Sequence, residues 1–150
     1  MARFFYSVVQ YLLFPLVVLR MVWRSRRAPA YRQRLGERLG YVPTVTGRPR
    51  VWVHAVSVGE TLAAAPMVNR LLEDHPEFQV VLTTTTPTGS ERVKALFGDA
   101  VYHCYAPYDV PGAVKRFLDR VQPRALIIME TELWPNLLYH TSQRSIPARG

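Results

Sequence analysis

From about residue 50 onward, short continuous apolar runs alternate with segments of helical spacing. The apolar runs predict strands over residues 50–56, 79–84, 100–105 and 125–129. The segments between them predict helices over residues 61–73, 88–97, 110–121 and 133–143. This alternation implies βαβ units, and continuously apolar strands imply a parallel sheet with helices on both faces. We therefore predict an α/β, Rossmann-like domain over residues 50–150. It would be truncated, because Ser145-Ile146-Pro147 looks like the start of a strand that does not develop.

An apolar stretch precedes this domain. Sixteen residues without a charge run from Phe4 to Leu19, and the stretch extends to Trp23 if Arg20 snorkels. We predict a membrane-anchor helix over residues 1–24. Spanning and interfacial placement both remain open at this length. A basic juxtamembrane segment and linker would follow over residues 25–49.

The positive charge is concentrated at the start of the chain. Residues 1–50 hold ten of the 19 Lys and Arg residues and one of the 11 acids, which leaves nine bases and ten acids for residues 51–150. The α/β domain thus has no basic stripe, which argues against nucleic-acid binding. The arginines after the apolar stretch predict a domain on the cytoplasmic side, in contact with membrane lipids. A single cysteine, Cys104, excludes an internal disulfide.

Candidate chemistry lies in the loops after the strands, because ligands of open parallel sheets bind at the carboxyl ends of the strands. The first loop contains Ser57, Gly59 and Glu60, with the Ser-x-x-Glu spacing of a helix capping box. Glu60 is therefore a cap, a general base towards a substrate hydroxyl, or both. Gly59 would let a ligand approach the backbone. Thr88 and Glu91 have the same spacing, which we interpret as a cap alone.

Glu130 ends the fourth predicted strand, so its side chain should project into the mouth of a cleft. There it would serve the chemistry, pair with a basic side chain or cap the next helix. Trp134 is expected to pack, and His54 to be buried rather than catalytic.

Motifs of several other classes are missing from the sequence. It contains no G-x-G-x-x-G or Walker-type phosphate loop, no Asp-x-Asp pair and no G-x-S-x-G elbow. Its four histidines do not have the spacing of metal ligands. We therefore expect no cofactor and no metal site in this chain.

Four segments together carry a family resemblance. They are HAVSVGETLAA over residues 54–64, TTTPTGSER over 84–92, YAPYD over 105–109 and METELWPN over 129–136. The chain resembles the Kdo transferases of lipopolysaccharide synthesis, which handle 3-deoxy-D-manno-octulosonic acid (Kdo). The first and last segments are specific in combination and order, and the apolar start and the Arg-rich stretch after it also look like this family.

The resemblance implies a GT-B glycosyltransferase, in which two Rossmann-like domains face a cleft. It implies transfer of Kdo from CMP-Kdo to the lipid A precursor, without a metal ion and with inversion at the anomeric carbon. This chain would be the acceptor-side half at the bacterial inner membrane, and the CMP-Kdo site would lie in a C-terminal domain. By motif position, Glu60 would be the general base and Glu130 would position or stabilise the transition state. Ser57 and Gly59 would contact substrate.

Two other interpretations remain open. The chain could be a catalytically inactive truncated fragment, since catalysis by proximity needs both substrates in one cleft. It could also be a membrane-tethered flavodoxin-like binding domain, although only Glu60, and no acidic cluster, follows the first strand. The sequence specifies neither the number of Kdo residues transferred nor the oligomeric state.

Overall fold

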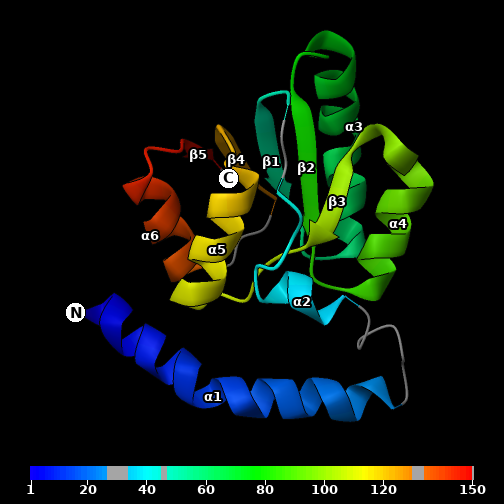
Figure 1. The fold of residues 1–150 in the computed structure, drawn as a ribbon. Helices are drawn as coiled ribbons and strands as arrows, with labels where there is room; N and C mark the ends of the chain where they lie inside the picture. Colours follow the sequence, from blue (N-terminus) through cyan, green and yellow to red (C-terminus); the bar gives the residue numbers. More distant parts are fainter. Residues whose placement is uncertain (27–33, 45–46, 130–133, 150) are drawn as a thin grey trace.

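The computed structural model describes residues 1–26, 34–44, 47–129 and 134–149. Within these ranges, five parallel strands form one sheet in the order β3-β2-β1-β4-β5 (Figure 1). The strands are β1 (Arg50–His54), β2 (Gln79–Thr84), β3 (Tyr102–Tyr105), β4 (Ala125–Ile128) and β5 (Ala148–Arg149). The predicted α/β fold with a parallel sheet is confirmed.

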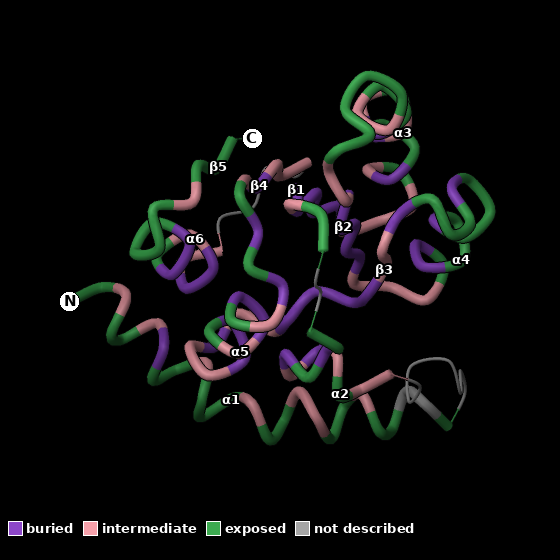
Figure 2. Tube along the Cα trace, turned by 45° about the horizontal axis from the view of Figure 1, so that its top comes forward, coloured by how far each residue is buried: buried purple, intermediate pink, exposed green. Residues whose placement is uncertain are grey.

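Helices cover both faces of this sheet (Figure 1). They are α3 (Val58–Asp74) and α4 (Pro87–Phe97) on one face, and α5 (Pro111–Val121) and α6 (Pro135–Gln143) on the other. Successive strand residues point to opposite faces. Trp52 therefore packs in the cluster with Phe117 of α5, whereas Val53 packs in the cluster with Val68 of α3. Figure 2 shows β1 and β2 as the buried centre of the domain, whereas the edge strand β5 is exposed.

The strand order places a topological switch point beside β1. The chain runs outward from β1 through β2 to β3 and then returns to β4 on the other side of β1. In such sheets, ligands bind in the crevice beyond the carboxyl ends of the two strands at the switch. The segment that follows β1 borders this crevice, and Glu60 lies there in the first turn of α3. Glu130 follows β4 in the sequence but lies outside the described residues.

The start of α4 differs from the prediction. Its N-cap is Thr86, whose side chain accepts a hydrogen bond of 3.1 Å from the backbone N–H of Gly89. Thr88 is inside the helix, and Glu91 is exposed. Pro87 explains the shift, since its fixed φ suits the first helical position and moves the cap to the residue before it. The interpretation of Thr88 and Glu91 as a capping box was wrong.

Part of the segment that we treated as juxtamembrane region and linker packs on the domain. The short helix α2 (Leu35–Arg38) contacts β3, and Val42 is 1% exposed in the core. The guanidinium of Arg38 lies 4.1 Å from the centre of the Tyr105 ring, and Arg38 as a whole is 4% exposed. This arginine is therefore part of the folded domain and not of a solvated flank.

The long apolar helix α1 (Ala2–Ser25) lies across the edge of the domain where the strands end (Figure 1). It contacts α6, Pro15 stands inside it, and Figure 1 shows the helix to be bent. Residues 2–23 are long and apolar enough to cross a membrane by length and composition. Large apolar side chains on its outer side are exposed: Phe4, Phe5, Val8, Val9, Leu12, Leu13, Leu16 and Leu19.

Candidate functional site

The predicted capping box at the start of α3 is present. Ser57 is the N-cap, and its Oγ accepts a hydrogen bond of 3.4 Å from the backbone N–H of Glu60. In return, Oε2 of Glu60 accepts from the backbone N–H of Ser57 at 2.8 Å and from its hydroxyl at 3.0 Å. Glu60 is thus held in one orientation, with one oxygen engaged by Ser57.

Gly59 lies exposed in the first turn of the same helix. Among the described residues beyond its own helix backbone, a Cβ added at this position would meet the Ser57 hydroxyl alone, at 3.9 Å. The backbone here is therefore open to solvent on one side, and the close approach of a ligand to Gly59 stays a prediction. Thr61 stabilises the first turn of α3, because its hydroxyl donates a hydrogen bond to the Ser57 carbonyl at 2.8 Å.

A buried polar chain supports the end of β1 beneath this turn. The indole N–H of Trp52 donates to Oγ1 of Thr83 at 2.8 Å, and the same oxygen lies 2.9 Å from Nδ1 of His54. His54 is 1% exposed, as predicted, and burial lowers its pKa to about 4. Its ring meets the Trp134 ring edge to face, with 4.9 Å between centroids. A neutral His54 therefore connects the end of β1 to the residue before α6.

The ends of β1 and β4 lie side by side. The backbone N–H of Met129 donates to the carbonyl of His54 at 2.9 Å. Glu130, the next residue, lies outside the described residues, so its predicted role stays untested. Trp134 packs against the cluster that contains Trp52 and Leu137, in agreement with the predicted packing role.

A second group of polar residues lies at the same edge of the sheet, beside the start of α6. These residues were not predicted individually from the sequence. The carboxylate of Asp109, in the loop after β3, caps α6 by accepting from the backbone N–H groups of Asn136 at 3.2 Å and Leu137 at 2.7 Å. It also accepts from the Tyr6 hydroxyl of α1 at 2.8 Å. Oδ1 of Asn136 accepts from the Ser7 hydroxyl at 3.0 Å. These bonds dock α1 beside the start of α6.

A signal for this docking is present in the sequence. Within the apolar stretch at the start of the chain, polar and aromatic residues recur at helical spacing, at positions 3, 6, 7, 10, 11 and 14. They define one face of a helix.

Arginines gather on the β3 side of the same edge. Nε of Arg34 forms an ion pair of 2.9 Å with Glu37, and its guanidinium lies 4.7 Å from the centre of the Tyr105 ring. Glu37 also accepts from the backbone N–H of Tyr105 at 3.0 Å. Across the described ranges, no three His, Cys, Asp or Glu side chains are grouped so that they could hold a metal ion.

Comparison with known proteins agrees with this geometry. The family model described as 3-deoxy-D-manno-octulosonic-acid transferase matches residues 33–149. The 3-deoxy-D-manno-octulosonic acid transferase of Haemophilus influenzae is 47% identical over 149 residues, covering 98% of this chain and 35% of that protein. The transferase of Bordetella pertussis is 42% identical over 160 residues, covering 98% of this chain and 36% of that protein.

A plant protein is also similar. The probable mitochondrial 3-deoxy-D-manno-octulosonic acid transferase of Arabidopsis thaliana is 39% identical over 144 residues, covering 95% of this chain and 32% of that protein. The chain thus spans about a third of the length of these curated relatives. Since the family model covers most of the chain, the chain belongs to the 3-deoxy-D-manno-octulosonic acid transferase family.

Proposed function

We propose that this chain is the acceptor-side half of an enzyme that transfers Kdo from CMP-Kdo to the lipid A precursor. The proposal is supported by membership of the transferase family and by the position of Glu60 at the switch point of the sheet. The CMP-Kdo site would belong to a second domain, as expected for a GT-B enzyme. A metal-independent, inverting reaction is part of the same proposal.

The orientation of Glu60 is the observation that carries this function. Its Oε2 is engaged by Ser57, while Oε1 has no hydrogen bond to any described residue, so a substrate hydroxyl could occupy that position. In the proposed step, Glu60 takes the proton of the acceptor hydroxyl while the oxygen of that hydroxyl forms a bond to the anomeric carbon of Kdo. The bond from that carbon to the phosphate of CMP breaks, and CMP leaves with the electron pair. Glu130 would position or stabilise this transition state.

A chimera tests the function. Residues 1–149 would replace the matched part of the Haemophilus influenzae transferase, and labelled CMP-Kdo and lipid A precursor would be supplied. We expect transfer by the chimera and a loss of about 100-fold to 10,000-fold in kcat for Glu60→Gln, since this is the usual contribution of general-base catalysis. Glutamine keeps a side chain that can cap the helix.

Glu91→Gln is the matched control, because Glu91 is an exposed glutamate near the start of the neighbouring helix α4. This variant should retain the activity of the chimera. Near-normal turnover by Glu60→Gln would leave that residue only its capping role. A chimera that folds but transfers no Kdo would contradict the proposed function itself.

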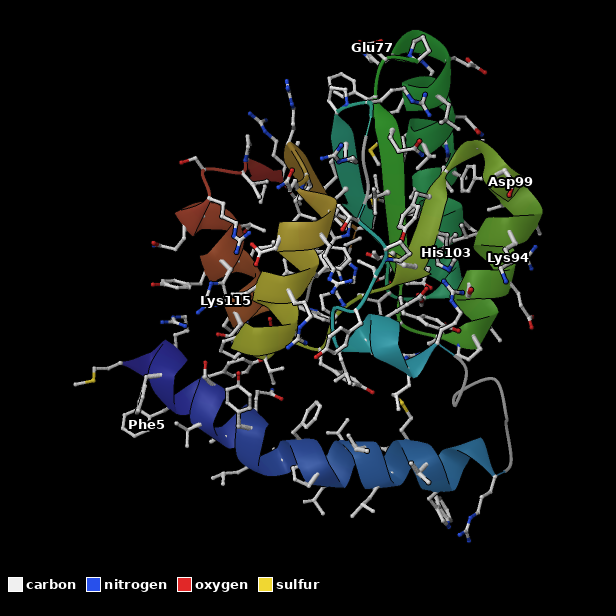
Figure 3. The ribbon with its side chains drawn as sticks, viewed as in Figure 1. Phe5, Glu77, Lys94, Asp99, His103 and Lys115 are labelled. Carbon is white, nitrogen blue, oxygen red and sulfur yellow. The ribbon has the colours of Figure 1, made fainter. Side chains whose placement is uncertain are left out.

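For attachment to the membrane, we propose that α1 lies in the plane of the interface. Phe4 and Phe5 are 63% and 64% exposed, and Figure 3 shows Phe5 projecting away from the domain. On the inner side, the Tyr11 hydroxyl accepts from the backbone N–H of Gly112 at 3.1 Å. A helix perpendicular to the membrane would lose these contacts, whereas an amphipathic helix in the interface keeps them.

Labelling of the two ends of α1 separates the two placements. Single cysteines at Ala2 and Arg26 would be introduced into a Cys104→Ser background, and inner-membrane vesicles of known orientation would be treated with an impermeant thiol reagent. An in-plane helix predicts labelling of both positions from the cytoplasmic side. Labelling from opposite sides would show that the helix spans the membrane.

A further inference from the structure

A pocket of about 320 Å³ separates part of α1 from α5. The side facing α1 is formed by Tyr11 and Phe14, and the opposite side by Val110, Ala113 and Arg116. Gly112 of α5 and, from the segment after α2, Leu39 and Tyr41 complete the lining. The volume falls within the range of small-ligand sites, and the wall is mostly hydrocarbon.

The pocket lies beside an exposed apolar part of α1. Leu12 and Leu16 of this helix, which do not line the pocket, are 72% and 60% exposed. Tyr11 and Tyr41 are themselves 50% and 53% exposed, with their rings at the pocket. Half-exposed tyrosines of this kind are typical of the level of the lipid head groups. An acyl chain could thus enter the pocket from the surface on which α1 lies.

The positively charged side chain of Arg116 lines the same pocket. Arg116 donates through Nη1 to the carbonyl of Leu39, and its guanidinium lies 4.1 Å from the centre of the Tyr41 ring. Nε and Nη2 have no hydrogen bond to any described residue, so they can bind an anion. Arg120 follows one turn later on α5, 5.6 Å from the same ring. A phosphate at the pocket would therefore meet Arg116, whereas Nη1 of Arg120 donates to the carbonyl of Val42 at 2.9 Å.

We propose that this pocket binds an acyl chain of an anionic phospholipid of the surrounding membrane, with the lipid phosphate at Arg116. The proposal rests on the in-plane placement of α1 given above. The bound lipid fills the space between α1 and α5 and thereby fixes α1 against the domain. The pocket is thus a lipid site separate from the crevice that contains Glu60.

Photolabelling tests the site. The 150-residue chain would be bound to phosphatidylcholine vesicles that contain a small amount of a photoreactive lipid. This lipid carries the photoreactive group in its acyl chain and is phosphatidylglycerol in one set of vesicles and phosphatidylcholine in the other. Labelled peptides would be mapped by mass spectrometry. We expect about fivefold more labelling of Tyr11, Leu39 and Tyr41 by phosphatidylglycerol, since one cation near an anionic lipid contributes this much. The outer face of α1 should be labelled by both lipids alike.

Three variants sharpen the result. Arg116→Gln should remove the preference for phosphatidylglycerol at the pocket, whereas Arg92→Gln, on the exposed side of α4, should keep it. Leu39→Trp fills the pocket and should reduce labelling there by both lipids. Circular dichroism would verify that each variant is folded, and labelling of the unmodified chain gives the map independently of the variants.

The outcomes separate this proposal from the placement of α1. A chain that floats with the vesicles but is labelled only on the outer face of α1 would overturn the lipid pocket alone. Equal pocket labelling by both lipids would overturn the assignment of Arg116 to the head group. Displacement of the label by lipid A precursor would show that the acceptor occupies the pocket instead. A chain that does not float would contradict the in-plane attachment, and this proposal with it.

Discussion

The hydroxyl of Tyr6 donates a hydrogen bond of 2.8 Å to the carboxylate of Asp109, 103 residues further along the chain. The same carboxylate caps α6, so one acid joins the apolar helix, the loop after β3 and the helix α6. Burial raises the pKa of Asp109, and the hydrogen bonds from Tyr6, Leu137 and Asn136 oppose this shift by favouring the carboxylate. The docking of α1 is therefore coupled to the start of α6.

Tyr6→Phe should weaken this docking. It removes a hydrogen bond to a charged acceptor and leaves the ring in place, so we expect the free energy of unfolding to fall by about 1.5–3 kcal/mol. Urea denaturation in mild detergent would measure it, with Tyr139→Phe as the control. Tyr139 is 37% exposed and contacts Arg3 through its ring, which phenylalanine keeps. Equal stability of the two variants would show that the Tyr6 hydroxyl does not hold α1.

Ser57→Ala should affect both stability and catalysis. Loss of this N-cap costs about 1 kcal/mol and also frees the side chain of Glu60, so we expect kcat of the chimera to fall. Thr86→Ala removes the corresponding cap of α4 and should cost a similar amount of stability without lowering kcat. Thermal unfolding and the Kdo-transfer assay would be run on both. A kcat that falls equally in both variants would indicate general destabilisation.

His54→Gln should reduce the acid sensitivity of the fold. The pKa of His54 is lowered from 6.5 to about 4 by burial, so between these pH values the unfolded chain binds a proton that the native state does not. The free energy of unfolding therefore decreases as the pH falls through this window, by up to about 3 kcal/mol for this one group. Urea titrations at pH 7 and pH 4.5 would measure it. The pKa of His103 is also lowered to about 4, so part of the dependence should remain.

Gly40→Ala should be strongly destabilising. Gly40 has a φ of +85°, and a Cβ there would overlap the carbonyl oxygen of Ala113 and lie 3.0 Å from the backbone nitrogen of Phe117. Both contacts are backbone atoms of α5, so we expect a loss of more than about 3 kcal/mol. Gly47→Ala is the control, since its φ of +94° imposes the same strain but no atom of the described residues lies within 4 Å of the added Cβ. This control should lower the free energy of unfolding by about 1–2 kcal/mol, as measured by urea denaturation.

The sheet could be predicted from the sequence because its strands are buried on both faces and therefore apolar throughout. The strand Gln79–Thr84 was predicted with its observed bounds. The strand expected from residue 100 begins at Tyr102, because Gly98–Ala100 form a turn of 3₁₀ helix. Local chemistry also predicted the cap of α3, since Ser57 and Glu60 are three residues apart.

Contacts between distant residues could not be predicted in this way. The burial of Arg38 depends on the Tyr105 ring, and Arg38 alone looks like one more basic residue of a membrane flank. Likewise, Asp109 and Asn136 meet only because α5 returns the chain across the sheet. The periodicity of an apolar run predicts a helix, but it does not specify which face docks or whether the helix crosses a bilayer.

The placement of α1 along the edge where β1 ends has a consequence for how the proposed acceptor would be found. If α1 rests in the interface and the chain binds this acceptor, the first turn of α3, which contains Glu60, lies close to the leaflet surface and not tens of ångströms above it. An acceptor anchored by its acyl chains would then reach the enzyme by lateral diffusion, without leaving the bilayer. The encounter becomes a two-dimensional search, in which acceptor density per unit of membrane area, and not its concentration in solution, sets the rate.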